Sequence, residues 1–129
     1  MYIMRNKEIE MSKFKVYQIQ LTKDEVEMIN TNGHNSVPKQ KMRLGLQTPV
    51  GDPPIAAMAK EALAADYYTH VANIEAYSLE DVFECGNIGP DKNIERLSPM
   101  MTSISVGDVV EDEDGVRHVV AIFGFEEVA

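Results

Sequence analysis

The side chains best suited to chemistry in this chain are three histidines and one cysteine. His34, His70 and His118 lie far apart in the sequence, and none belongs to an HxH or HExxH spacing. A metal site would need ligands gathered from distant segments, so we expect neither a metal nor a cofactor. Cys85 falls near the C-terminal end of a helical pattern, where the helix dipole disfavours a thiolate. We therefore expect a packed thiol and not a nucleophile.

A second feature is an acidic run made of Glu111, Asp112, Glu113 and Asp114. A calcium loop of the EF type needs a bidentate Glu about six residues after its glycine, but that position after Gly115 is Ala121. The run ends in Asp-Gly between two β-rich segments, which predicts a solvent-exposed hairpin tip. As a functional site, this acidic finger would contact a basic surface of another protein.

An alternative site would combine a carboxylate with a histidine in one pocket. The candidates are His70, Glu75 and Asp108, and their pairing would indicate a small enzyme or a small-ligand-binding domain. Gly107 also predicts a tight bend in which the Asp108 carboxylate accepts hydrogen bonds from backbone amides. A third hypothesis is a structural or oligomeric scaffold protein, which a large apolar surface patch would favour.

Three segments that position these groups have helix signals. Thr22 and Glu25 form a capping box at the start of a helix that should end at Gly33, and the apolar stripe of this helix consists of Val26, Met28 and Ile29. Residues 55–65 contain six alanines and follow Asp52, a candidate helix cap. Ser78 caps a third helix, on which we expect Phe83 to be buried.

Strand signals occur in residues 12–21, 67–76, 103–110 and 116–125, and the last two predict a C-terminal β-hairpin. Residues 42–47 fit either a strand or a helix, and residues 91–97 at most a short helical turn. We predict a loose extension at residues 1–11. Residues 12–129 should form a single α+β domain, with a mostly antiparallel sheet and two to three short helices.

The chain has 129 residues and a net charge of −9, which is unevenly distributed. Residues 1–60 contain nine Lys and Arg against six Asp and Glu, giving +3, whereas residues 61–129 contain three against fifteen, giving −12. Such an acidic half repels phosphates, so we expect no direct nucleic-acid binding. The single cysteine, and the lack of a membrane-spanning or signal-like apolar run, favour a cytoplasmic protein without membrane attachment.

The C-terminal half also contains a set of short sequence strings, in the order S-x-S-V-G-D-V-V, D-G, V-V and F-G-F-x-x-V. Together with Leu79-Glu80-Asp81-Val82-Phe83 and Asn87-Ile88, they span about residues 70–128. In these strings the chain resembles the YodL-like family of small proteins of bacterial mobile elements and phages. The resemblance implies a phage or mobile-element origin, and it implies no enzymatic activity.

These observations favour a non-enzymatic accessory protein that binds, and in the stronger form inhibits, a host protein with a basic surface. The acidic half is the expected contact surface, with residues 111–114 as its centre. If the protein is phage-encoded, it would act in the host cytoplasm. A homo-oligomer is compatible with the same sequence.

Overall fold

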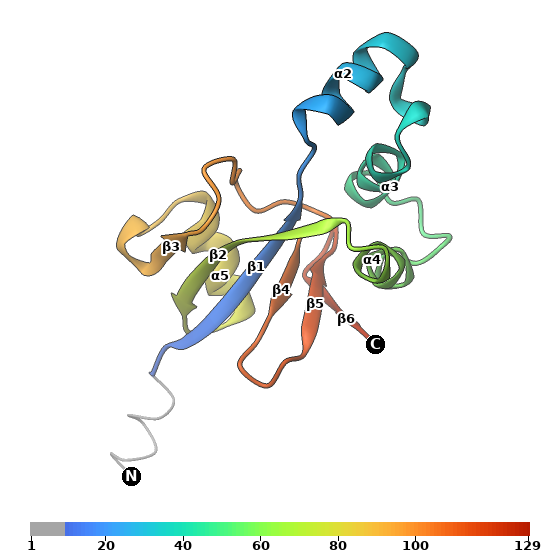
Figure 1. Ribbon diagram of the computed structural model, residues 1–129. Coiled ribbons are helices and arrows are strands. Elements are labelled where there is room, and N and C mark those ends of the chain that lie inside the picture. Colours follow the sequence, from blue (N-terminus) through green and yellow to red (C-terminus); the bar gives the residue numbers. More distant parts are fainter. Residues whose placement is uncertain (1–9) are drawn as a thin grey trace.

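A six-stranded sheet lies at the centre of the computed structural model, which describes residues 10–129 (Figure 1). The strand order is β3-β2-β1-β4-β5-β6, and all neighbouring strands are antiparallel. The strands are β1 Ser12–Ile19, β2 Tyr68–Ala76, β3 Ile94–Arg96, β4 Val109–Glu111, β5 Arg117–Val120 and β6 Phe125–Val128. The predicted single α+β domain with its antiparallel sheet is confirmed.

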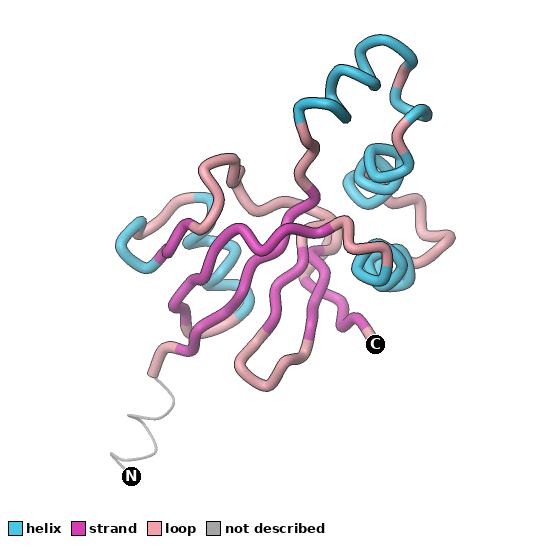
Figure 2. Tube along the Cα trace, in the orientation of Figure 1, coloured by secondary structure: helices cyan, strands magenta, loops and turns pink. Residues whose placement is uncertain are grey.

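Residues 10–129 contain four α-helices, compared with the two to three expected (Figure 2). They are α2 Lys23–Asn32, α3 Pro38–Gln47, α4 Ile55–Ala64 and α5 Leu79–Asn87, with short 3₁₀ turns η1 His34–Ser36 and η2 Asp91–Asn93. The additional helix is α3, which covers the segment that fitted both a strand and a helix. Pro38 stands at its start, where the missing backbone donor costs nothing.

Two apolar clusters lie on opposite faces of the sheet. Neighbouring residues of a strand point to opposite faces, and accordingly Val109 and Val110 belong to different clusters. One cluster packs α5 against the sheet through Val82 and Cys85. The other packs α4 through Ala59 and Ala62 together with Leu46 of α3. Helices therefore cover part of both faces.

Helix α2 extends away from the sheet, as Figure 1 shows. Its capping box forms as predicted: the Glu25 amide donates to Thr22 Oγ1 at 3.1 Å, and the Thr22 amide donates to Glu25 Oε1 at 2.8 Å. The apolar stripe is not buried, because Val26 is 41% and Met28 46% exposed. The local pattern thus specifies a helix, but the fold provides no apolar surface to cover this face.

Other boundaries also differ from expectation. Helix α4 begins after Pro54 without a side-chain cap, so Asp52 does not serve as one. On α5, Ser78 caps the helix as predicted, but Phe83 is 40% exposed instead of buried. Phe83 borders a surface hollow together with Val120 and Ile122, near the turn after β5.

The predicted strand at residues 103–110 also needs correction, whereas the short helical turn predicted within residues 91–97 is present at Asp91–Asn93. Residues 103–108 form an irregular segment, and only Val109–Glu111 joins the sheet, because the chain bends at Gly107. Residues 94–96 add β3 at the sheet edge through pairing with β2, a contact distant in sequence that no local pattern signals.

The predicted loose extension, residues 1–11, lies mostly outside the described residues. Glu10 and Met11 precede β1, are exposed and belong to no helix or strand. The longest helices have ten residues. Within residues 10–129, none has the length and apolarity needed to cross a bilayer.

Candidate functional site

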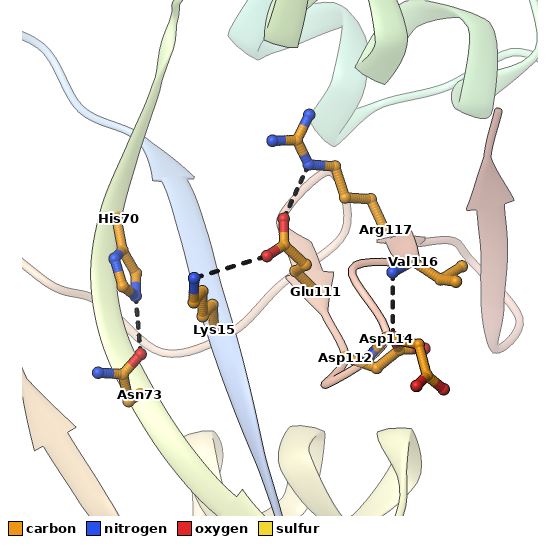
Figure 3. Close-up of polar contacts among 8 residues, drawn as sticks. All are labelled: Lys15, His70, Asn73, Glu111, Asp112, Asp114, Val116 and Arg117. Atoms are coloured by element: carbon orange, nitrogen blue, oxygen red, sulfur yellow. Dashed lines mark hydrogen bonds and ion pairs between the residues drawn. The ribbon is translucent and has the colours of Figure 1, made fainter.

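The acidic run forms the turn between β4 and β5, so the predicted hairpin is confirmed. Asp112 shapes the turn: its Oδ1 accepts hydrogen bonds from the amides of Asp114 at 2.9 Å and Val116 at 3.0 Å (Figure 3). Gly115 supplies a positive φ of 82°, which a side chain would strain. The Asp-Gly pair in the sequence therefore has the conformational role that was expected of it.

Most of the acidic finger is already bonded within the protein. Glu111 lies between two cations, with Arg117 Nε at 3.0 Å and Lys15 Nζ at 3.8 Å (Figure 3). Glu113 accepts a hydrogen bond from the Lys13 amide at 3.0 Å. Asp114 is exposed and its carboxylate has no partner among residues 10–129. The charge available to another molecule at this tip therefore comes from Glu113 and Asp114.

Asp112 is further engaged by His118, whose Nε2 lies 3.1 Å from Oδ2. Burial acts to raise the pKa of Asp112, but hydrogen bonds from His118 and from the Val116 and Asp114 amides outweigh it and lower the pKa. The carboxylate is thereby kept ionised as a structural element of the turn.

His70 lies on a polar part of the sheet that the helices leave open. Its ring stacks on Tyr17 with the ring centroids 5.1 Å apart, and Nε2 lies 2.8 Å from Asn73 Oδ1. Because the Asn73 amide nitrogen donates to Glu95 at 2.8 Å, its oxygen is an acceptor, and His70 Nε2 must carry the proton. Glu75, on the same strand, is exposed opposite Lys13.

Asp108 lies elsewhere, in the bend before β4. Its Oδ2 accepts from the Ser105 amide at 2.9 Å, which confirms the predicted bond to the backbone, and from Gln18 Nε2 at 3.0 Å. Burial raises the pKa of Asp108 to about 7, against the opposing effects of these hydrogen bonds and of the Arg43 charge. A carboxylate that changes charge near neutral pH is a candidate for binding or proton exchange.

The alternative site made of His70, Glu75 and Asp108 is not assembled. Gln18, the partner of Asp108, points to the opposite face from its neighbour Tyr17, against which His70 stacks. The residues that do surround Asp108 include Gln18 and Arg43, and sequence reasoning linked neither of them to Asp108. The polar Gln18 in an otherwise apolar strand face was a signal for the first residue, whereas Arg43 was noticeable only as one of a cluster of basic residues with Lys39 and Lys41.

Gln18 also attaches the segment before β4 to the sheet. Its side-chain nitrogen donates to the carbonyls of Thr102 at 3.0 Å and Ser103 at 3.3 Å, and its oxygen accepts from the Thr102 amide at 3.1 Å. The Tyr68 hydroxyl donates to the Gly107 carbonyl at 2.6 Å. Burial, and secondarily the Asp108 charge, raise the Tyr68 pKa, so this hydroxyl stays protonated.

An exposed apolar turn connects β5 to β6. Ile122 is 60% and Phe123 91% exposed, and Gly124 adopts a positive φ of 73° in this turn. Ile122 contributes to two adjacent surface hollows, one bordered by Glu80 and the other by Glu126. The turn therefore combines apolar and acidic groups on one surface.

The remaining candidates for chemistry are Cys85 and His34. Cys85 is buried, and burial together with nearby acidic residues raises the pKa of its thiol. His34 Nδ1 accepts a hydrogen bond from Gln40 Nε2 at 3.1 Å. Within the part of the chain that the structure describes, no three His, Cys, Asp or Glu side chains gather as a metal site would require.

Comparison with protein-family models, with curated proteins and with solved structures finds no match to this chain.

Proposed function

We propose that this protein is a non-enzymatic accessory protein of a phage or mobile element, and that it acts by binding a basic host protein. The observation that supports this most is the exposure of acidic side chains over the C-terminal half. The exposed acidic residues there are Glu61, Asp66, Glu75, Glu80, Glu84, Asp91, Glu95, Glu113, Asp114, Glu126 and Glu127. In the described residues, Asp91 alone among them has a cation within ion-pair distance, namely Arg96 at 3.0 Å. The others have no cation at ion-pair distance within residues 10–129, although Glu95 and Glu113 each accept one hydrogen bond, from the Asn73 side chain and from the Lys13 amide.

The hairpin tip, which carries part of this acidic surface, extends beyond the ends of β4 and β5 (Figure 1). Glu113 and Asp114 supply its outward charge, whereas Glu111 and Asp112 hold the hairpin together. Exposed charges of this kind accelerate association with an oppositely charged partner and make binding depend on salt. Of the four carboxylates that the sequence suggested as the contact surface, the proposal therefore keeps two, Glu113 and Asp114.

At the opposite end of β5, Ile122 and Phe123 offer an apolar anchor within the same acidic half. Protein interfaces commonly place aromatic and apolar groups in the desolvated centre and charged groups at the rim. A partner with an apolar contact flanked by Lys or Arg would match both features.

The test is affinity capture of bacterial proteins on the tagged protein at low and at high salt. A recovered protein is then purified and its Kd measured. Reversing both outward charges, Glu113→Lys with Asp114→Lys, should weaken binding about five- to thirtyfold at low salt, since each rim pair contributes about 0.5–1 kcal/mol. The same variant should bind with a smaller salt dependence.

A matched control is Glu61→Lys with Asp66→Lys, which changes the net charge equally at exposed positions of the α4 region. Equal weakening by both variants would assign the effect to net charge and reject the hairpin tip as the contact. If the same protein is captured equally well at low and high salt, and by the wild type and both variants, electrostatic binding is contradicted.

A further inference from the structure

A cavity of about 240 Å³ lies where the C-terminal end of β1, helix α3 and the segment before β4 meet. Pockets for drug-sized ligands commonly measure about 300–1,000 Å³, so this cavity fits a small metabolite. It is distinct from the acidic hairpin and from the apolar turn, neither of which contributes a lining residue.

The lining contains one group of each charge. Asp108 and Arg43 are its only charged residues, and their charged groups do not form an ion pair with each other. Among the described residues, the Arg43 side chain makes only a long hydrogen bond, 3.4 Å, to Gln40 Oε1. Asp108 uses Oδ2 for both of its hydrogen bonds, so Oδ1 has no partner within residues 10–129. Both charges are therefore available to a molecule in the cavity.

The rest of the wall is mixed in character. Amide and hydroxyl groups come from side chains such as Gln20, Gln47 and Thr102, whereas residues such as Ile19, Leu46 and Val106 supply apolar surface. Such a wall accommodates a ligand with polar ends and an apolar body, because each part then meets a matching surface.

We propose that this cavity binds a small zwitterion, namely a free α-amino acid with an apolar side chain. The ammonium group contacts Asp108, the carboxylate contacts the Arg43 guanidinium, and the side chain lies against the apolar wall. Guanidinium and carboxylate form bidentate hydrogen bonds, and charge-assisted bonds of this kind are the strongest polar contacts that proteins make.

The ionisation of Asp108 leads to a second prediction, which concerns the protons released on binding. An ammonium group next to Asp108 favours its charged form, so binding near pH 7 should release part of a proton from a carboxyl whose pKa is about 7 in the empty cavity. The neighbouring Tyr68 hydroxyl stays protonated, and Arg43 keeps its charge. Affinity should accordingly fall as the pH is lowered below 7.

The experiment is isothermal titration calorimetry of the whole protein with L-leucine, L-methionine and L-valine. We expect saturable binding by at least one of them. N-acetyl-L-leucine lacks the ammonium charge and L-leucinamide lacks the carboxylate, so each should bind at least tenfold more weakly than leucine. Titration at pH 7 in phosphate and in Tris, which differ in ionisation enthalpy, measures the released proton.

Two substitutions test the residues. Asp108→Asn and Arg43→Gln should each weaken binding at least tenfold, whereas Arg43→Lys should restore part of it. Amide chemical-shift changes at Gly107 and Ser105 of the unmodified protein keep the test independent of how well the variants fold.

Three results would overturn the proposal: no binding of any amino acid at millimolar concentration, equal binding of the acetylated and amidated analogues, or unchanged affinity in both variants. None of these results bears on the binding of a basic protein, since the two surfaces share no residue.

Discussion

Replacing Asp108 with Asn should make the protein progressively more stable relative to the wild type as the pH rises from about 5 to about 8. The carboxylate is buried between the bend at Gly107 and Gln18, and burial raises its pKa from the ordinary 3.8 to about 7. A group whose pKa is higher in the folded state stabilises fully below the unfolded-state pKa, and this stabilisation is lost as pH rises through the folded-state pKa. The wild type should therefore lose stability from about pH 4 to about pH 7.

The size of the effect follows from these two values. Integrated between pH 5 and pH 8, the difference in proton binding by Asp108 amounts to about 2–3 kcal/mol of unfolding free energy. The asparagine side chain of the variant cannot ionise, so the stability of the variant minus that of the wild type should rise by this amount between the two pH values. Subtracting one protein from the other removes the contributions of all other titrating groups.

The assay is urea-induced unfolding of both proteins at pH 5 and pH 8 in amino-acid-free buffer, followed by circular dichroism. Glu127→Gln, which removes an exposed carboxylate from β6, is the control for the change in net charge. A difference between the Asp108→Asn variant and the wild type that stays constant with pH would refute the argument, because it would mean that water solvates the carboxylate in the folded protein. An equal pH-dependent change in the control would assign the effect to net charge instead.

Two further predictions concern the backbone. Thr22→Ala removes the cap of α2 and should cost the helix about 1 kcal/mol. Because α2 buries no residue, the loss should appear as faster amide hydrogen exchange within α2 while the midpoint of global unfolding stays unchanged, and a large shift of that midpoint would contradict the structure. Gly107→Ala would place a Cβ 2.9 Å from the Leu46 Cβ at a positive φ of 96°. It should destabilise the protein by about 2 kcal/mol more than Gly115→Ala. Gly115 is a matched control, because it has a similar positive φ but a Cβ added there would meet nothing within 4 Å. Equal unfolding free energies of the two variants would show that Leu46 does not crowd the bend at Gly107.

Local sequence determined most of the regular structure. Thr22 and Glu25 specify the start of α2, Ser78 that of α5, and Asp-Gly the turn between β4 and β5, since each signal acts within four residues or so. The same kind of reasoning anticipated that Asp108 would bond a backbone amide only three residues away, at Ser105. Such contacts are readable because chain connectivity already brings the groups together.

Tertiary structure decided which of these groups are available for binding. Glu111 is paired with Arg117 and with Lys15, which lies on another strand nearly a hundred residues earlier, whereas Glu113 has no cation partner among the described residues and stays exposed. Asp108 meets Gln18 and Arg43 in a cavity, although His70 and Glu75 were equally plausible partners by residue type. Strand pairing and helix packing fix these distances, and they depend on the summed burial of the whole chain. The sequence therefore determined the elements and the charge, and only the folded chain determined which charges remain exposed and which share the cavity.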